Sequence, residues 1–252
     1  MNKTVSMGLM LGLALAATPA SAQIEAEGIY WFATPDGTGS VGISGIAGTR
    51  FDVQDDLGFD EAEGMVGANL YLGDKHQLGL GYLVLDAQAR NELSADIRYQ
   101  DLIFRVSTDV VSTLEASLIR ALYRMNLGED SLQGGIILGA QYLDLDAEVQ
   151  SDDVGRAFAR IKTPMPVVGG HLRFDPTQWA SLRASFSGVS LGIADVDATY
   201  WDAEASALLT WDAGPFAGVG YRHLVIDAED TSEEVTVDLT FNGPFLVGGF
   251  AW

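Results

Sequence analysis

The stretch Tyr200–Trp211, YWDAEASALLTW, alternates between apolar and polar side chains along its whole length. Its odd positions are all apolar, whereas its even positions include Asp202 and Glu204. Successive side chains of a β-strand point to opposite faces, so this pattern predicts a strand with one apolar and one polar face.

The two tryptophans that end the apolar face lie ten residues apart, at Trp201 and Trp211. At about 3.3 Å per residue and a tilt of about 40°, they are separated by about 25 Å along a membrane normal. Outer-membrane β-barrels have an apolar band of this height, with an aromatic girdle at each edge. We therefore predict that Trp201 and Trp211 occupy the two girdles. A half-buried strand of a soluble protein is the alternative interpretation.

Stretches of this kind recur through the chain, and many contain glycine. The pattern predicts ten strands, at Ile24–Ala33, Glu63–Gly73, Gln77–Ala87, Val111–Asn126, Leu132–Glu148, Ala157–Phe174, Trp179–Leu191, Val196–Trp211, Pro215–Ile226 and Glu234–Trp252. Alternating segments of about ten residues separated by turns are typical of transmembrane β-barrels.

The connections between these strands alternate in length. Residues 73–76, 127–130, 175–178 and 212–214 form short turns, and residues 34–62, 88–110, 149–156, 192–195 and 227–233 form longer, acidic loops. Outer-membrane barrels have short turns on the periplasmic side and long loops outside. We predict a closed antiparallel barrel, with ten strands favoured and eight to twelve possible. The upper limit allows for extended pieces at 48–58 and 95–106.

The first 22 residues, MNKTVSMGLMLGLALAATPASA, combine Lys3, an apolar stretch and an Ala-Ser-Ala cleavage site. This is the pattern of a secretory signal peptide, so we predict cleavage before Gln23 and a barrel domain over residues 23–252. An uncleaved anchor helix is disfavoured, because the apolar stretch is shorter than the roughly 20 residues that span a bilayer.

The composition narrows the range of partners. The chain has 35 acidic and 14 basic residues, a formal net charge of −21 at pH 7 and no cysteine. Such acidity disfavours nucleic acid and docking on anionic lipid through basic patches. No later segment has about 18 uninterrupted apolar residues, so no transmembrane helix is predicted.

The signal peptide, the glycine-rich alternating strands and the terminal Phe-Ala-Trp together resemble a small bacterial outer-membrane β-barrel protein. The resemblance covers the mature chain and points to no defined subfamily. It implies that the C-terminal aromatic is recognised by the barrel-assembly machinery. On this basis Leu246, Phe250 and Trp252 form the predicted assembly signal.

The last predicted strand has two apolar phases. Val235, Val237, Leu239 and Phe241 are odd-numbered, whereas Leu246, Phe250 and Trp252 are even-numbered. We expect a β-bulge at Asn242-Gly243-Pro244 to shift the register between them.

The face opposite the apolar one collects charged residues that would point into the lumen. They are Glu25, Glu27, Arg120, Arg124, Arg173, Arg183, Asp202, Glu204 and Arg222, with His171 nearby. Isolated charges there would be costly, whereas arginine–carboxylate pairs satisfy both partners. A ten-stranded barrel is close to the size that side chains fill, so we favour a structural network over an ion-selective constriction or a catalytic cluster.

Two site hypotheses remain weaker. His171 could face Ser181 across the turn at 175–178, as a base beside a nucleophile. Acidic runs at 52–63, 144–153 and 226–234 have oxygen ligands that suit Ca²⁺ or Mg²⁺, but they lack EF-hand spacing and equally suit a solvated surface. We therefore assign no catalytic, cofactor or metal site.

The sequence thus predicts a non-catalytic, monomeric barrel in the bacterial outer membrane, exported through the periplasm, with a role in envelope structure or surface interaction. Its expected partners are outer-membrane lipid, lipopolysaccharide and, during biogenesis, the assembly machinery. A narrow porin-like channel is the first alternative, and a lipid-modifying hydrolase is the second.

Overall fold

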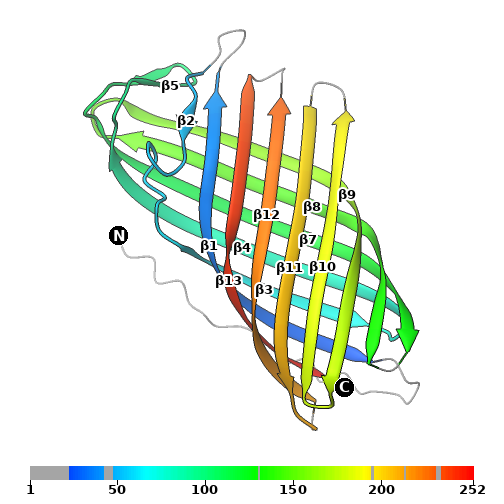
Figure 1. Ribbon diagram of the computed structural model, residues 1–252. Coiled ribbons are helices and arrows are strands. Elements are labelled where there is room, and N and C mark those ends of the chain that lie inside the picture. Colours follow the sequence, from blue (N-terminus) through cyan, green and yellow to red (C-terminus); the bar gives the residue numbers. More distant parts are fainter. Residues whose placement is uncertain (1–22, 43–47, 130, 194–195, 213, 231–233) are drawn as a thin grey trace.

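The computed structural model describes residues 23–42, 48–129, 131–193, 196–212, 214–230 and 234–252. The signal peptide predicted at residues 1–22 lies outside these ranges. Within them ten long antiparallel strands close into one barrel (Figure 1), which confirms the predicted fold. They are β1 (Ile24–Val41), β3 (Glu63–Leu72), β4 (His76–Glu92), β7 (Asp109–Glu129), β8 (Leu132–Ser151), β9 (Gly155–Thr177), β10 (Ala180–Ile193), β11 (Val196–Thr210), β12 (Pro215–Asp230) and β13 (Val235–Ala251). No helix in the described residues is long and apolar enough to cross a membrane.

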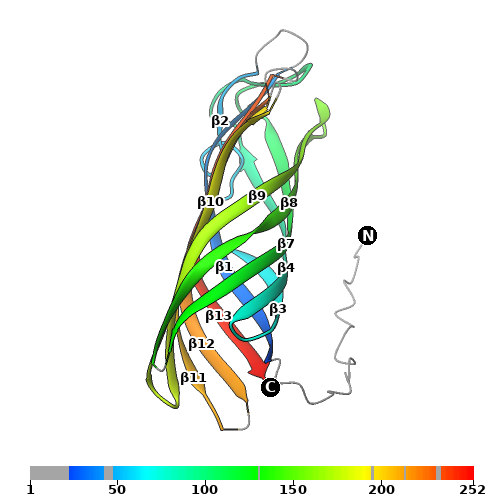
Figure 2. The ribbon, with the colours of Figure 1, turned by 90° about the vertical axis from the view of Figure 1, so that its right-hand side faces the viewer.

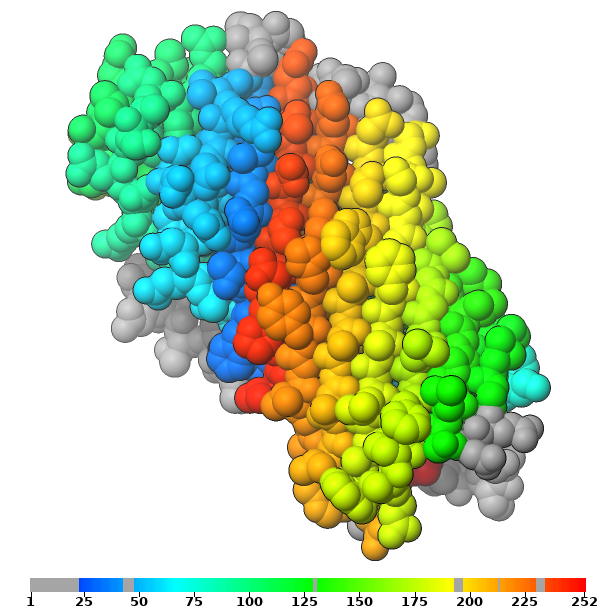
Figure 3. All heavy atoms as spheres, viewed as in Figure 1, coloured from blue at the N-terminus to red at the C-terminus, as the bar shows by residue number. Residues whose placement is uncertain are grey.

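The barrel is closed by pairing between the first and last strands. The Trp252 N–H donates to the Ile24 carbonyl at 2.8 Å, and the Ile24 N–H donates to the Trp252 carbonyl at 3.2 Å. Figure 3 shows β13 lying against β1 along the visible part of this seam. Closure leaves no exposed sheet edge here, so the chain end is held in the ladder and does not fray.

Three further strands lie outside the ten-stranded wall. β2 (Phe51–Asp52) pairs with β1, and β5 (Ile97–Tyr99) pairs with β6 (Leu102–Phe104). They come from the two extended pieces that the sequence places in the long loops. They cap one end of the barrel (Figure 1) and leave its ten-stranded circumference unchanged.

Most strands are longer than the sequence predicts. β9 has 23 residues and β7 has 21, whereas about 9–11 residues are enough for a strand to cross a bilayer. In β1 and β12 the additional residues lie at the ends joined by the long loops, up to Val41 and Asp230, whereas β7 and β9 extend at both ends and reach Glu129 and Thr177 in the short turns. The result is an elongated, flattened barrel that is wide in Figure 1 and narrow in Figure 2.

The apolar face of the wall changes sides along the strands. In the lower part of β8, towards the short turns, Leu138 and Tyr142 point outward and are 44% and 40% exposed. In the upper part Leu143 and Leu145 point inward and are buried, while Asp144 points outward. β4, β7 and β12 make the same exchange. The lower barrel is therefore apolar outside, whereas the upper barrel has the apolar interior of a water-soluble domain.

This exchange explains the two apolar phases of β13. Its register with β12 runs unbroken through Asn242-Gly243-Pro244, and its register with β1 is the same on both sides of a two-residue gap at Gly243-Pro244, so the predicted bulge is wrong. Phe241 and Phe245 are both buried on the inner face. The apolar phase changes because the outer face becomes apolar below this point. Gly243 fits a close approach, since a Cβ there would clash with the Phe32 carbonyl oxygen.

A hydrophobic core fills the upper barrel. The capping segments contribute buried side chains to it, namely Phe51, Val53, Leu57, Phe59, Ile97, Tyr99 and Phe104. Burial raises the pKa of Tyr99, whose hydroxyl donates to the Ala147 carbonyl at 3.1 Å. The fully buried Trp31 donates from Nε1 to the Gly243 carbonyl at 3.1 Å, close to the level where the barrel changes character.

Replacement of this tryptophan tests the importance of the core. We expect Trp31→Ala to lower the free energy of unfolding by about 3–5 kcal/mol, because it leaves a large cavity and an unpaired carbonyl. The control Phe158→Ala removes an aromatic side chain that is 60% exposed, and should change stability by less than about 0.5 kcal/mol. Urea unfolding of vesicle-inserted protein measures both. Equal effects would contradict the core described above.

Candidate functional site in the barrel lumen

Charged and polar side chains fill the lower lumen, beneath the hydrophobic core. Four arginines (Arg120, Arg124, Arg183, Arg222) face inward, together with four carboxylates (Glu25, Glu27, Asp202, Glu204). The alternation of their strands places them on the face opposite the exposed apolar residues. With every group ionised, their formal charges cancel.

Asp202 on β11 is the centre of the first cluster. Arg222 binds it through two hydrogen bonds, Nε to Oδ1 at 2.8 Å and Nη2 to Oδ2 at 2.6 Å. Arg120 and the Tyr200 hydroxyl both donate to Oδ2 at 3.2 Å. Asp202 and Arg222 are almost completely buried, so this carboxylate is saturated by donors from three strands.

Arg183 on β10 is the centre of the second cluster. Its guanidinium donates to both Glu25 oxygens, at 2.5 and 3.2 Å, and lies 3.9 Å from Glu27. Glu27 also accepts a 2.7 Å hydrogen bond from Asn69. This cluster ties β1 to β10 across the lumen, because the contact joins residues 158 positions apart in the chain.

The two clusters meet at Asn69. Its Oδ1 lies 3.5 Å from Nη2 of Arg120, so the amide joins the Glu27 group to the Asp202 group. Arg124 lies over the Tyr71 ring, with 4.2 Å between its Cζ and the ring centroid. Asn69, Tyr71 and Tyr200 are members of the site that charge alone did not single out. Their positions on the inward phase of their strands are the signal that marks them.

Two of the predicted lumen residues stand apart. Arg173 pairs with Asp175 beside the turn, at 3.0 Å, and does not join either cluster. Glu204 faces inward next to Arg222 in the strand register, without an ion pair among the described residues. The predicted charged filling thus describes only the lower lumen, because the upper lumen is apolar.

Within the described residues, the histidines form no arrangement of nucleophile and base. The β9–β10 register places His171 opposite Ser185, so the predicted pairing with Ser181 is wrong. The chain reverses at Gln178-Trp179 and not at Pro176, and this moves the partner of His171 by four residues. His171 lies 2.8 Å from the Asn126 side-chain oxygen instead.

The other two histidines contact aromatic residues. The His76 ring nitrogen lies 2.6 Å from the Tyr123 hydroxyl. The ring centroids of His223 and Trp201 are 4.7 Å apart.

Several residues of the predicted acidic runs take part in local structure. Asp52 caps its own turn by accepting hydrogen bonds from the N–H groups of Gln54 and Asp55. On the outer wall, β8 and β9 form a ladder of ion pairs, Asp144–Lys162, Asp146–Arg160 and Glu148–Arg156. Among the described residues, no group of three or more histidines or acids has the geometry to hold a metal ion.

The predicted girdle and assembly residues lie on the outer face. Trp211 is 53% exposed near the short turns, and Trp201 lies ten residues above it, packed against Phe186. Leu246 and Trp252 are 51% and 64% exposed, and Phe250 packs against Trp252. Their roles in a membrane and in assembly stay predictions.

No protein-family model matches this sequence, and no curated protein does. Among solved structures, the outer membrane protease OmpT of Escherichia coli aligns with a TM-score of 0.56 at 9% identity, covering 91% of this chain and 96% of OmpT. The transport unit of the autotransporter AIDA-I of Escherichia coli aligns at 0.42 and 9% identity, over 96% and 92% of the two chains. Ail, the attachment invasion locus protein of Yersinia pestis, aligns at 0.37 and 10% identity, over 92% and 99%. The chain has the fold of bacterial outer-membrane β-barrel proteins, without a defined subfamily.

The Asp202 cluster gives a direct test of the lumen network. We expect Asp202→Asn to destabilise the barrel by about 3–5 kcal/mol, because it leaves Arg222 and Arg120 buried without their carboxylate. The control Asp175→Asn breaks the partly exposed pair with Arg173 and should cost less than about 1 kcal/mol. Urea unfolding in lipid vesicles compares the two, and an Asp202→Asn effect no larger than the control would refute the network.

Proposed function

We propose that this protein is an integral barrel of the bacterial outer membrane with a non-catalytic role in envelope structure or surface interaction. The observation that carries the proposal is the exchange of polarity along the wall. The lower half presents apolar side chains outward, such as Leu80, Val219 and Leu246, whereas the upper half presents acids outward over an apolar core. The lower half suits lipid and the upper half suits water.

Aromatic residues mark the level at which the outer face changes. Tyr82, Tyr142, Phe186 and Tyr221 are each at least 40% exposed and lie at the top of the apolar face of their strands. Aromatic side chains prefer the membrane–water interface. Their position supports an outer-leaflet boundary here, with the acidic upper barrel and its caps outside the cell.

The filling of the lumen supports a structural role over transport. The charge clusters occupy the lower lumen, and the core with its capping segments occupies the upper lumen. In the described residues, none of the three histidines forms a hydrogen bond with a serine or a carboxylate, which supports a non-catalytic protein. OmpT is named a protease, but 9% identity carries only the fold to this chain.

The proposed location in the outer membrane determines which partners we expect for this protein. The apolar band would contact outer-membrane lipid, and the rim above it would contact lipopolysaccharide. The predicted assembly signal would engage the barrel-assembly machinery after export through the periplasm. A closed wall of ten strands needs no second subunit, so we expect a monomer.

Conductance tests the filled lumen. Refolded protein in planar lipid bilayers should give no steady current steps, because side chains from both layers occlude the path. A general porin treated in the same way is the positive control. Steady openings would overturn the proposal in favour of the narrow channel.

Truncation tests the assembly signal. We expect deletion of Phe250–Trp252 to give an exported chain that fails to insert, since it removes the end of the β1–β13 seam and the terminal aromatic pair. Outer-membrane fractionation and heat-modifiable gel migration measure insertion. Removal of the exposed capping hydrophobe by Ile103→Ser is the control and should leave insertion intact. Normal insertion of the truncated chain would contradict the role of these residues.

A further inference from the structure

The wall is open between β9 and β10 in its upper part. The pairing of these strands ends at Gly188 opposite Val168. Above this point residues 155–167 of β9 pair only with β8, and residues 189–193 of β10 pair only with β11. Figure 2 shows the two strands diverging upward. Each strand therefore presents an unpaired edge.

Two prolines explain why the strands separate. If the register continued, Pro166 and Pro164 would lie opposite Ser190 and Gly192. The ladder between β8 and β9 runs unbroken past both prolines. Because neighbouring residues of a strand direct their N–H groups to opposite sides, an intact β8 ladder requires both proline nitrogens to face β10. The prolines thus remove two donors that would join β9 to β10.

The two edges differ in their protection. Proline and charged side chains discourage strand addition, and the edge of β9 carries Arg156, Arg160, Lys162 and both prolines. The edge of β10 reads Val-Ser-Leu-Gly-Ile, with neither charge nor proline. A second gap, between upper β1 and β4, is covered by the segment after β2, where the Val53 N–H donates to the Gly37 carbonyl at 3.0 Å. In the described ranges no such segment covers the edge of β10.

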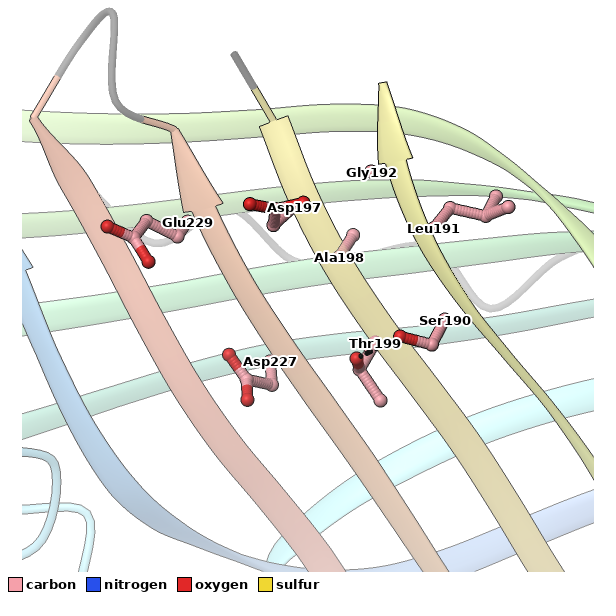
Figure 4. A pocket seen from close by; sticks show the side chains of 8 residues that line it. All are labelled: Ser190, Leu191, Gly192, Asp197, Ala198, Thr199, Asp227 and Glu229. Carbon is pink, nitrogen blue, oxygen red and sulfur yellow. Dashed lines mark hydrogen bonds between the residues drawn. The ribbon is translucent and has the colours of Figure 1, made fainter. Parts of the chain in front are cut away.

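An acidic depression adjoins this edge on the outer face (Figure 4). It has a volume of about 340 Å³ and is lined by Ser190, Leu191, Gly192, Asp197, Ala198, Thr199, Asp227 and Glu229. Asp197 lies opposite Glu229 in the strand register, and Asp227 lies opposite Asp238. Like charges placed opposite each other are destabilising. In the described part of the chain none of the three lining carboxylates forms an ion pair, unlike the acids of the β8–β9 ladder.

We propose that the edge of β10 binds an extended segment of another protein that alternates basic and apolar residues. The segment adds a strand through main-chain hydrogen bonds with Ser190 and Gly192. Its basic side chains extend across the outer face of β10 toward Asp197 on β11, the nearest carboxylate of the depression, while Asp227 and Glu229 on β12 add to the negative potential there. Its apolar side chains continue the inner face of Val189 and Leu191. The proposal rests on the proposed function, which places this edge outside the membrane.

A synthetic peptide of alternating lysine and valine, about ten residues long, is the probe. The full chain is held in nanodiscs of zwitterionic lipid, so that the peptide gains nothing from the lipid charge. Fluorescence anisotropy measures binding, and hydrogen exchange measures the amides of Ser190 and Gly192. We expect binding with protection of these two amides. A peptide with glutamate in place of lysine, and one N-methylated at alternate residues, should each fail to bind.

Variants separate the main-chain and charge contributions. Ser190→Pro should weaken binding by roughly tenfold or more, because it removes an edge donor, whereas Ser190→Ala keeps the N–H and should bind normally. Combined replacement of Pro164 and Pro166 by valine should abolish binding by letting β9 pair with β10. Asp197→Asn with Asp227→Asn and Glu229→Gln should weaken binding. The same charge removal at Asp144, Asp146 and Glu148 is the matched control and should have no effect.

Three outcomes would overturn the proposal. The first is that the peptide does not bind at millimolar concentration. The second is that binding persists both in the Ser190→Pro variant and with the N-methylated peptide. The third is that this chain forms a dimer that the Ser190→Pro substitution dissociates. This third outcome would show that the edge of β10 binds a second copy of this chain and not a different protein. Bilayer conductance of the same protein distinguishes failure of this proposal from failure of the proposed function. A barrel that neither conducts ions nor binds the peptide would contradict the peptide site alone and leave the filled-lumen function intact.

Discussion

A strand that leaves lipid and continues into water has to exchange the roles of its two faces. Below the aromatic level, apolar side chains are stabilised outside and polar ones must pair inside. Above it, the hydrophobic effect favours the apolar side chains inside. The strands obey both demands without a break in register, as β8 shows between Tyr142 and Leu143. The charged lower lumen, the hydrophobic upper core and the acidic outer wall all follow from this one constraint.

Most of the interior charges are stabilised by partners within the two clusters. Asp202 has three donors and Glu25 has a two-pronged arginine, so few lone pairs remain for a substrate or an ion. Removing one partner of a buried pair costs more than forming the pair contributes. Such a network stabilises the lower lumen as long as both partners of each pair are present.

Period-2 alternation was enough to predict the ten strands and which residues face the lower lumen. The pattern alone gives a wrong prediction where the apolar face of a strand changes from the outside to the inside of the barrel. In the sequence alone, the change of apolar phase near Asn242 resembles a β-bulge. A one-residue register shift and an exchange of the apolar face from the inside to the outside of the barrel produce the same pattern of side chains. The sequence predicts loops where the upper ends of several strands lie, because acids such as Asp227 and Glu229 are exposed to solvent both on a loop and on the outer face of a strand.

Contacts between distant strands could not be predicted. The pairing of Glu25 with Arg183 depends on the closed barrel, and the placement of His171 depends on where the chain reverses, at Gln178-Trp179 and not at Pro176. The split between β9 and β10 does leave a trace in the sequence, as Pro164 and Pro166 two residues apart in an otherwise continuous strand. That trace gains a meaning only when the register shows which residues the prolines would face.

The seam between β1 and β13 also sets an order of events during folding. Glu25 and Glu27 belong to the first strand, while their partner Arg183 lies on β10, beyond the middle of the chain. Until the ends of the chain meet, the sheet is an open ribbon whose inner face remains accessible to water. The carboxylates and guanidinium groups can thus stay hydrated through most of assembly. Glu25, Glu27 and Arg183 can meet only when the ring closes, because β1 and β10 are not neighbours in the sheet, whereas Asp202 and Arg222 lie on adjacent strands.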